Sequence, residues 1–296
     1  MIICIMDNRP VLFLDSGIGG LPYCHHFHRH NPAERLVYVA DRAYFPYGPR
    51  EQGELIGLLI ALMTRLMRLF NPKVGVLACN TASVSALAAL REAFPGLPLV
   101  GTVPAIKPAV LESRKQRTGV LGTERTITDP YVMKLAARYR PECTVMGIAA
   151  PDLVEFVEHR HTLADDEERR QVVVPYIERF RAAGVDTVVL GCTHFLFLLE
   201  EFRAAAVPDI GVHDSIAGIS HRVEALLDRD EKTMRSQENQ EDPLNMLVVT
   251  GEAPLEPSWQ SRADAFGLVL HRLEDLDPPR GVLHPQALTI PAGIYP

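Results

Sequence analysis

Two cysteines occupy matching positions in the chain. Cys79 lies in the segment VLACNT (residues 76–81) and Cys192 in the segment VLGCTH (residues 189–194). Each ends an apolar, β-branched run that predicts a strand, and each precedes a stretch that predicts a helix. Backbone N–H groups at a helix N-terminus favour a thiolate and lower the pKa of a thiol. If the two units face each other, one thiol can remove a proton from a carbon atom while the other returns one to the opposite face.

The residues that follow each cysteine extend this interpretation. Asn80, Thr81, Thr193 and His194 offer hydrogen-bond donors for a carboxylate, and His194 can also exchange a proton with a thiol. A single buried cysteine is more often an inert core residue, but the repeated frame favours a functional role. Zinc sites prefer close Cys or Cys/His groups, and the sequence has no CxxC motif. A cysteine hydrolase needs one nucleophile and would leave the second frame unexplained.

Three further segments have a structural explanation beside a functional one. Asp15 ends the first predicted strand and precedes the segment SGIGG (residues 16–20), which is either a helix-capping turn or a loop that contacts a ligand. The turn PYG (residues 46–48) is either only a rigid turn or a loop that presents Tyr47 and the next backbone N–H to a substrate. The segment CHHFHRH (residues 24–30) is interpreted as a solvated, His-rich helix face in preference to a metal site.

Composition excludes several classes of protein. The chain has 296 residues, of which 47% are hydrophobic and 23% charged, as in ordinary globular proteins. No apolar run approaches the roughly 20 residues that span a bilayer, and the N-terminus lacks the features of a signal peptide, so we expect a cytoplasmic protein. The five cysteines are widely spaced and odd in number, which predicts free thiols. The net charge of −7 and the absence of a basic, aromatic run argue against a nucleic-acid partner.

Short apolar runs alternate with helical patterns along the chain. The predicted strands are Val11–Asp15, Leu36–Asp41, Val74–Cys79, Leu99–Thr102, Gly119–Thr123, Thr144–Ala149, Thr187–Cys192, Ile210–Asp214 and Asn245–Gly251. The predicted helices are Glu51–Phe70, Thr81–Phe94, Asp129–Arg140, Asp165–Ala183 and Phe195–Ala206. This alternation indicates an α/β fold with mostly parallel sheets, whose ligands bind beyond the carboxyl ends of the strands.

Two segments near the C-terminus break this pattern. Asp228–Pro243 is charged, with almost no apolar residues, and is expected to be an exposed loop or linker. From Asp277 onward the chain is rich in Pro and Gly without periodicity, which predicts an extended tail.

Four motifs, in this order and spacing, resemble those of the glutamate racemase family, within the cofactor-independent aspartate/glutamate racemase superfamily. They are Asp15-Ser16-Gly17, Pro46-Tyr47-Gly48, Cys79-Asn80-Thr81-Ala82-Ser83 and Gly191-Cys192-Thr193-His194. The resemblance covers roughly residues 11–270. The chain departs from the family pattern after Thr123, where it reads ERTITD (residues 124–129), and at Ala150 and Leu196.

The resemblance implies a fold, a set of site residues and an activity. The implied fold has two pseudo-symmetric α/β domains, residues 1–100 plus 211–296 and residues 101–210, each with a mostly parallel sheet flanked by helices, and the active site lies between them. The implied catalytic residues are Cys79, Cys192, Asp15, His194 and a glutamate, Glu158 or the nearby Glu155. The implied substrate contacts are Asp15, Ser16, Tyr47, Gly48, Asn80, Thr81, Thr123, Thr193 and His194. The activity is interconversion of L- and D-glutamate for peptidoglycan synthesis, without cofactor or metal, in a homodimer.

Two alternatives stay open. Aspartate and hydantoin racemases of the same superfamily also use paired cysteines, so the substrate can differ while the fold stays the same. A non-catalytic α/β protein that binds an amino acid could keep the pocket without the reaction. Neither a membrane nor a nucleic acid is expected as a partner.

Overall fold

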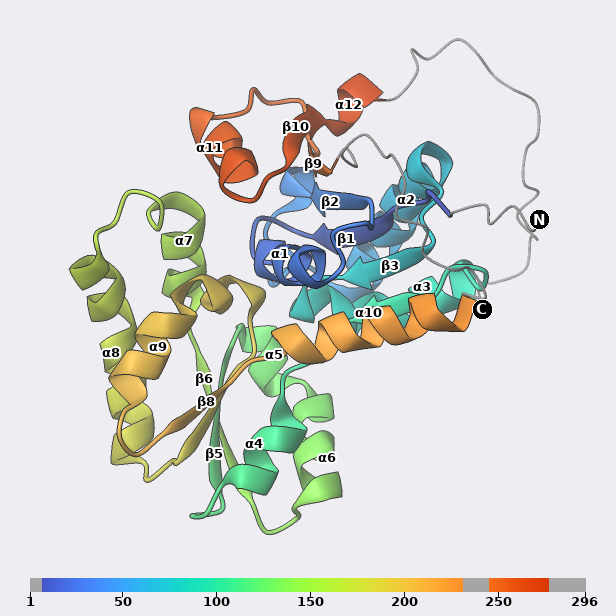
Figure 1. Ribbon diagram of the computed structural model, residues 1–296. Helices are drawn as coiled ribbons and strands as arrows, with labels where there is room; N and C mark the ends of the chain where they lie inside the picture. The colour runs from blue at the N-terminus through green and yellow to red at the C-terminus, as the bar shows by residue number, and fades with distance from the viewer. Residues whose placement is uncertain (1–6, 231–244, 277–296) are drawn as a thin grey trace.

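The computed structural model describes residues 7–230 and 245–276 and contains two separate parallel sheets (Figure 1). The six-stranded sheet has the order β10-β9-β2-β1-β3-β4, and the four-stranded sheet has the order β6-β5-β7-β8. The strands are β1 (Val11–Asp15), β2 (Leu36–Ala40), β3 (Val74–Leu77), β4 (Leu99–Gly101), β5 (Arg117–Gly122), β6 (Thr144–Ala149), β7 (Thr187–Leu190), β8 (Gly211–His213), β9 (Met246–Val249) and β10 (Val269–Arg272). The predicted α/β fold is confirmed.

Four strands of each sheet repeat one topology. The order β2-β1-β3-β4 in the larger sheet corresponds to β6-β5-β7-β8 in the smaller one, and all these strands are parallel. Cys79 follows β3 and Cys192 follows β7, so the two cysteines leave equivalent strands. The matching sequence frames therefore reflect equivalent places in the two sheets.

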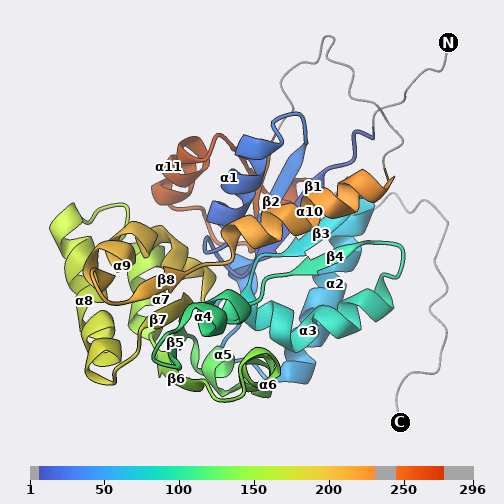
Figure 2. The same cartoon turned by 60° about the horizontal axis from the view of Figure 1, so that its bottom comes forward.

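Helices cover the faces of both sheets. They are α1 (Leu21–His30), α2 (Gln52–Phe70), α3 (Asn80–Ala93), α4 (Ile106–Glu112), α5 (Glu124–Thr128), α6 (Pro130–Tyr139), α7 (Pro151–His159), α8 (Asp166–Ala182), α9 (Leu199–Ala206), α10 (Ile216–Asp230), α11 (Pro257–Ala265) and α12 (Leu273–Leu276). Two short 3₁₀ helices, η1 (Arg42–Tyr44) and η2 (Thr193–Leu198), follow β2 and Cys192. Figure 2 shows α10 lying across the larger sheet, on the side away from α2 and α3.

The alternation of side chains along β1 explains this layering. Val11 and Phe13 pack with residues of α1 and α10, whereas Leu12 and Leu14 pack with residues of α2 and α3. Successive side chains of a strand point to opposite faces, and a strand covered on both faces reads as a continuous apolar run. All five residues of β1 are buried, as this position at the centre of the sheet requires.

The longest helix, α2, shows how local sequence sets an element. The Glu51 carboxylate caps its N-terminus by accepting the Glu54 N–H at 2.9 Å, and Asn71 ends it in the left-handed conformation at φ 43°. Leucines at helical spacing form its buried face against the sheet: Leu55, Leu59, Leu62 and Leu66. The predicted helix Glu51–Phe70 is therefore confirmed.

All nine predicted strands correspond to observed strands, and β10 was not predicted. β10 lies at the edge of the larger sheet and is only partly buried, so it lacks a continuous apolar run. The predicted helix Phe195–Ala206 is wrong in its first third, where the chain forms the 3₁₀ helix η2 before α9 begins at Leu199. The apolar residues there are compatible with either a 3₁₀ helix or an α-helix, so the sequence does not distinguish the two.

The expected division into residues 1–100 plus 211–296 and residues 101–210 stays a prediction. β4 extends to Gly101 in the larger sheet, and β8, which begins at Gly211, pairs with β7 in the smaller one. Most of the predicted loop Asp228–Pro243 and the predicted tail from Asp277 lie outside the described residues; α10 includes residues 228–230. Within the described residues, none of the helices has the length and apolar character needed to cross a bilayer.

Candidate active site

Residues at the carboxyl ends of β1, β3, β5 and β7 line a cavity of about 1000 Å³ between the two sheets. Parallel strands expose their terminal backbone groups and the following loops at this edge, which is where α/β proteins bind ligands. Among the residues predicted from the sequence, eleven line this cavity: Ser16, Tyr47, Gly48, Cys79, Asn80, Thr81, Thr123, Cys192, Thr193, His194 and Glu155, the alternative to Glu158. Asp15 and Glu158 are buried and contact residues of this group.

The first thiol, Cys79, occupies the N-cap position of α3 and comes from the larger sheet. Burial raises the pKa of Cys79 well above its ordinary value, as do the negative charge of Asp15 and the hydrogen bond between the two side chains. The hydrogen bond from the backbone N–H of Ala82 opposes this rise without reversing it. The expectation that the helix N-terminus lowers the pKa of this thiol is therefore wrong, because burial and a neighbouring carboxylate outweigh the helix.

The second thiol, Cys192, comes from the smaller sheet and precedes η2. Its Sγ lies 3.7 Å from Nδ1 of His194, and Nε2 of His194 lies 2.7 Å from Oε1 of Glu158. Burial alone would lower the pKa of His194, but Cys192 and Glu158 together hold it well above its ordinary value. Between the two glutamates that the sequence left open, Glu158 is buried against His194, whereas Glu155 is exposed and lines the cavity.

Burial also acts on the two buried carboxyl groups, with opposite outcomes. Burial raises the pKa of Asp15. The positive charge of His194 and the groups that donate hydrogen bonds to Asp15, which include Thr193, act against this rise. Burial would raise the pKa of Glu158 too, but His194, the Ile18 N–H and the charge of Arg262 together hold it below its ordinary value. Two carboxyl groups of one site are therefore tuned in opposite directions.

Glycines allow the two halves of the site to come close together. A Cβ atom added at Gly17 would lie 2.1 Å from Oε1 of Glu158, and one at Gly19 would lie 2.4 Å from Oγ1 of Thr193. Hydrogen bonds cross at the same place, because the Ile18 N–H donates to Oε1 of Glu158 at 3.0 Å and the Thr193 hydroxyl donates to Oδ2 of Asp15 at 3.1 Å. The loop after β1 is thus a contact surface between the halves as well as part of the site.

Asn80 and Thr81 begin α3 beside Cys79. Both polar atoms of the Asn80 amide are buried without a hydrogen-bond partner among the described residues. Buried amides are normally hydrogen-bonded, so this side chain is available for a ligand. Oγ1 of Thr81 lies within hydrogen-bond distance, 3.4 Å, of Oγ1 of Thr123, which follows β5 of the smaller sheet.

The loop that carries Tyr47 is fixed by contacts that the sequence did not indicate. The Tyr47 hydroxyl donates to Oδ2 of Asp41 at 2.6 Å, and the Thr250 hydroxyl donates to Oδ1 of the same carboxylate at 2.6 Å. From the other half, Nε of Arg125 donates to the Gly48 carbonyl at 3.2 Å, and the guanidinium also contacts the Arg50 carbonyl. Tyr47 therefore presents its ring to the cavity with its hydroxyl proton already committed.

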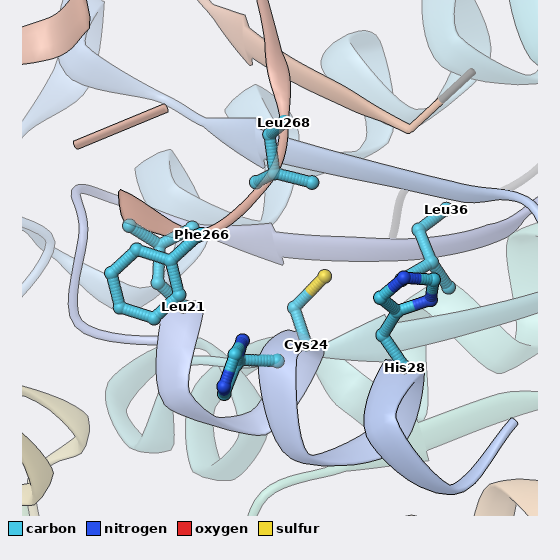
Figure 3. A pocket seen from close by; sticks show the side chains of 7 residues that line it. Leu21, Cys24, His28, Leu36, Phe266 and Leu268 are labelled. Atoms are coloured by element: carbon cyan, nitrogen blue, oxygen red, sulfur yellow. The ribbon is translucent and has the colours of Figure 1, made fainter. Parts of the chain in front are cut away.

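The His-rich segment on α1 lies apart from this cavity. The described residues contain no group of three or more His, Cys, Asp or Glu side chains placed to hold a metal ion. Cys24 is buried beside Leu21, Leu36 and Leu268 around a small apolar pocket that His28 also lines (Figure 3). The four cysteines in the described part of the chain are all free and buried.

Two thiols that come from different sheets and line one cavity, each with an acid/base partner, can exchange protons with the two faces of one carbon atom. A family model described as Asp/Glu/hydantoin racemase matches residues 26–218. The chain belongs to this family. Glutamate racemase of Treponema pallidum is 42% identical over 210 residues, which cover 71% of this chain and 78% of that protein.

Two further members of the family extend the likeness over most of the chain. Glutamate racemase of Bartonella bacilliformis is 36% identical over 249 residues, covering 83% of this chain and 91% of that protein. The crystal structure of Escherichia coli glutamate racemase, in complex with L-glutamate and the activator UDP-MurNAc-Ala, matches with a TM-score of 0.75 at 30% identity. It covers 89% of this chain and 97% of that one. Amino-acid racemisation is therefore the reaction class of this protein.

Proposed function

We propose that this racemase interconverts L- and D-glutamate by moving protons between Cα and two thiols. The observation that carries the mechanism is that Cys79 and Cys192 leave equivalent strands of two sheets and line one cavity. The curated relatives above are glutamate racemases, which supports glutamate as the substrate. The product D-glutamate serves peptidoglycan synthesis, and we expect the enzyme to act in the cytoplasm as a homodimer.

In each turnover, a thiolate removes the α-proton and becomes a thiol, while the opposite thiol donates its proton and becomes a thiolate. The two sulfurs exchange these roles for the reverse reaction, so the net charge of the pair is unchanged. Asp15 supports Cys79 as its proton acceptor: burial raises the pKa of Asp15 and so makes it a stronger base than an ordinary aspartate. His194, held by Glu158, supports Cys192, because a protonated imidazole stabilises negative charge on the adjacent sulfur.

The carbanion that forms at Cα needs stabilisation from the surrounding donors. Asn80 and Thr81 at the N-terminus of α3, together with the backbone N–H of Thr193, supply donors for the α-carboxylate as its negative charge grows. Ser16, Tyr47, Gly48 and Thr123 complete the wall that positions the substrate. No step of this chemistry draws on a cofactor or a metal ion.

Deuterium exchange in heavy water tests the two-thiol mechanism. The parent enzyme is expected to place solvent deuterium at Cα of both enantiomers and to remove the optical rotation of either one. Cys79→Ser and Cys192→Ser are each expected to leave the optical rotation of glutamate unchanged, because neither variant racemises it. Cys143→Ser is the matched control, since Cys143 is a buried free thiol outside the cavity. Racemisation at near-parental rate by either cavity variant would falsify the mechanism.

A substrate panel separates this assignment from its alternatives. Glutamate, aspartate and a 5-substituted hydantoin are compared by the rate at which each loses optical rotation. The proposal expects glutamate to be racemised fastest, and preference for another member would reassign the substrate while keeping the mechanism. Binding of glutamate without deuterium at Cα would instead indicate a protein that only binds amino acids.

A further inference from the structure

Arg262, on α11, is a buried charged residue with an unusual set of contacts. It is 6% exposed, and its guanidinium lies 5.3 Å from the ring centroid of Trp259. Its Nη2 donates to the backbone carbonyl of Glu158, while its Nε has no partner among the described residues. Burying an incompletely bonded guanidinium is costly, so an apolar side chain would pack here with less penalty. A role beyond packing explains why an arginine occupies this place.

The hydrogen bond from Arg262 ends on Glu158, the residue that binds His194 beside Cys192. Glu158 lies in the last turn of α7, where backbone carbonyls have no partner within the helix. Oε1 of its carboxylate accepts two hydrogen bonds, one from Nε2 of His194 at 2.7 Å and one from the Ile18 N–H at 3.0 Å. Arg262 therefore binds the backbone of the same residue whose side chain orients the imidazole beside Cys192. The donor comes from an element next to the larger sheet, and α7 follows β6 of the smaller one (Figure 1).

We propose that Arg262 is a positioning residue for racemisation: by holding the end of α7 it keeps Glu158 against His194 and so keeps His194 aligned with Cys192. This inference rests on the proposed function, because it assigns Arg262 to the acid/base group of that reaction. It also makes the C-terminal segment that carries α11 part of the second thiol's support, although the segment donates nothing to the cavity itself.

The charges around this group determine how a change at Arg262 is felt. Three groups face the His194 ring: Cys192, which follows β7, Glu158, which lies on α7, and Asp15, which ends β1. The charge of Glu158 also acts to raise the pKa of Tyr38 on β2. The charge of Glu256 acts to raise the pKa of Arg262, and the charge of Arg262 acts to lower the pKa of His161. Among these groups Arg262 is a positive charge that favours the ionised form of Glu158.

The sign of the expected effect follows from these contacts. Without Arg262 the pKa of Glu158 rises, because a positive charge that favours the carboxylate is lost and the helix end is less well held. A less ionised, less fixed Glu158 supports the imidazolium less, so the pKa of His194 falls. The pH range in which Glu158 is ionised and His194 is protonated therefore narrows from both sides.

The test compares Arg262→Met and Arg262→Lys with Arg272→Met in the full-length chain. Arg272 is the matched control, because its Nη2 donates to the carbonyls of Gly251 and Glu252 at 3.2 and 2.8 Å, in the same C-terminal segment but away from α7. One readout is the pH profile of kcat/KM for glutamate racemisation. The other is the NMR titration of the His194 ring in histidine-labelled protein, assigned by the signal that His194→Gln loses.

Arg262→Met is expected to lower kcat about tenfold and to move the alkaline limb and the His194 titration midpoint down by about one pH unit. Arg262→Lys keeps the positive charge, so its His194 titration midpoint is expected to lie close to the parental value. Arg272→Met is expected to leave both the pH profile and the midpoint at the parental values. An unchanged midpoint in both Arg262 variants overturns the proposal even if their activity is low. Absence of racemisation in the parent enzyme would instead defeat the proposed function, while the NMR titration still reports on Arg262. If Arg262→Met does not fold, Arg262→Gln takes its place, because glutamine keeps an N–H donor for the Glu158 carbonyl but removes the positive charge. The proposal then expects a lowered His194 midpoint in Arg262→Gln, and an unchanged midpoint in that variant overturns it.

Discussion

The Asn80 side chain carries a buried polar group that no described residue of the free protein satisfies, and the proposed function explains this by a hydrogen bond to the substrate. Its amide is buried and carries no hydrogen bond within the described structure, whereas most buried amides are bonded. An unsatisfied buried polar group costs about 1–3 kcal/mol of folding free energy. Such a cost persists where the partner arrives with the substrate.

Replacing Asn80 by leucine, which has a similar shape and no polar atoms, separates stability from function. Asn80→Leu is expected to raise the free energy of unfolding by about 1 kcal/mol and to lower kcat/KM for glutamate about 100-fold. Urea unfolding and optical rotation measure the two effects. Asn31→Leu is the control, because the Asn31 amide donates to the Phe27 carbonyl and to Glu224, so this change should destabilise the protein instead. A less stable Asn80→Leu protein would contradict the argument.

At the scale of elements, the loop after β1 decides how closely the two halves approach. A Cβ atom at Gly19 would lie 2.4 Å from Oγ1 of Thr193 and 2.7 Å from Nδ1 of His194. Neither side chain can yield freely, because Thr193 donates to Asp15 and His194 is bonded to Glu158. A side chain at this glycine must therefore displace the group that supports the second thiol.

Gly19→Ala is expected to lower kcat/KM at least 100-fold, since a misplacement of about 1 Å in an active site can cost that much. Gly57→Ala provides the control, because Gly57 lies on the exposed side of α2 and an added Cβ meets nothing within 4 Å. That change should raise stability by about 1 kcal/mol through helix propensity and leave kcat/KM unchanged. Near-parental activity in Gly19→Ala would show that the halves do not need this close contact.

At the scale of the whole molecule, the buried pair of His194 and Glu158 links stability to pH. The pKa of Glu158 is lowered from 4.5 in the folded protein, so its contribution is present above about pH 4.5 and is lost as pH falls through the lowered value. The pKa of His194 is raised from 6.5, so its contribution is present below about pH 6.5 and is lost as pH rises through the raised value. The pair therefore stabilises the fold most between these two limits.

Glu158→Gln should lower the free energy of unfolding by about 3 kcal/mol near pH 5.5, because it leaves a buried charge without its partner. The difference from the parent is expected to shrink as pH rises well above neutrality, where His194 loses its proton in both proteins. Urea unfolding midpoints across this range measure it. A difference that stays constant with pH would mean that the pair contributes no charge interaction.

Local sequence was sufficient to predict most of the strands and the positions of the two thiols. A strand covered on both faces needs a continuous apolar run, so β1, β3 and β7 are visible without knowing what covers them. Cys79 and Cys192 directly follow such runs, and parallel strands place their ends at one edge. Among the described helices, α4, α5, α7, α10, α11 and α12 were not predicted, and most of them are short, with four to nine residues.

The protonation of the site was decided only by tertiary structure. Cys79 precedes a helix, which argues for a lowered pKa, yet burial and Asp15, 64 positions earlier in the numbering, raise it. Asp41 receives a hydrogen bond from Thr250, 209 residues away, and Arg262 binds the carbonyl of Glu158, 104 residues away. Spacing along the chain carries no information about such contacts. Desolvation and charge interactions depend on what packs around a group in space, and that is established only when the two halves close on each other.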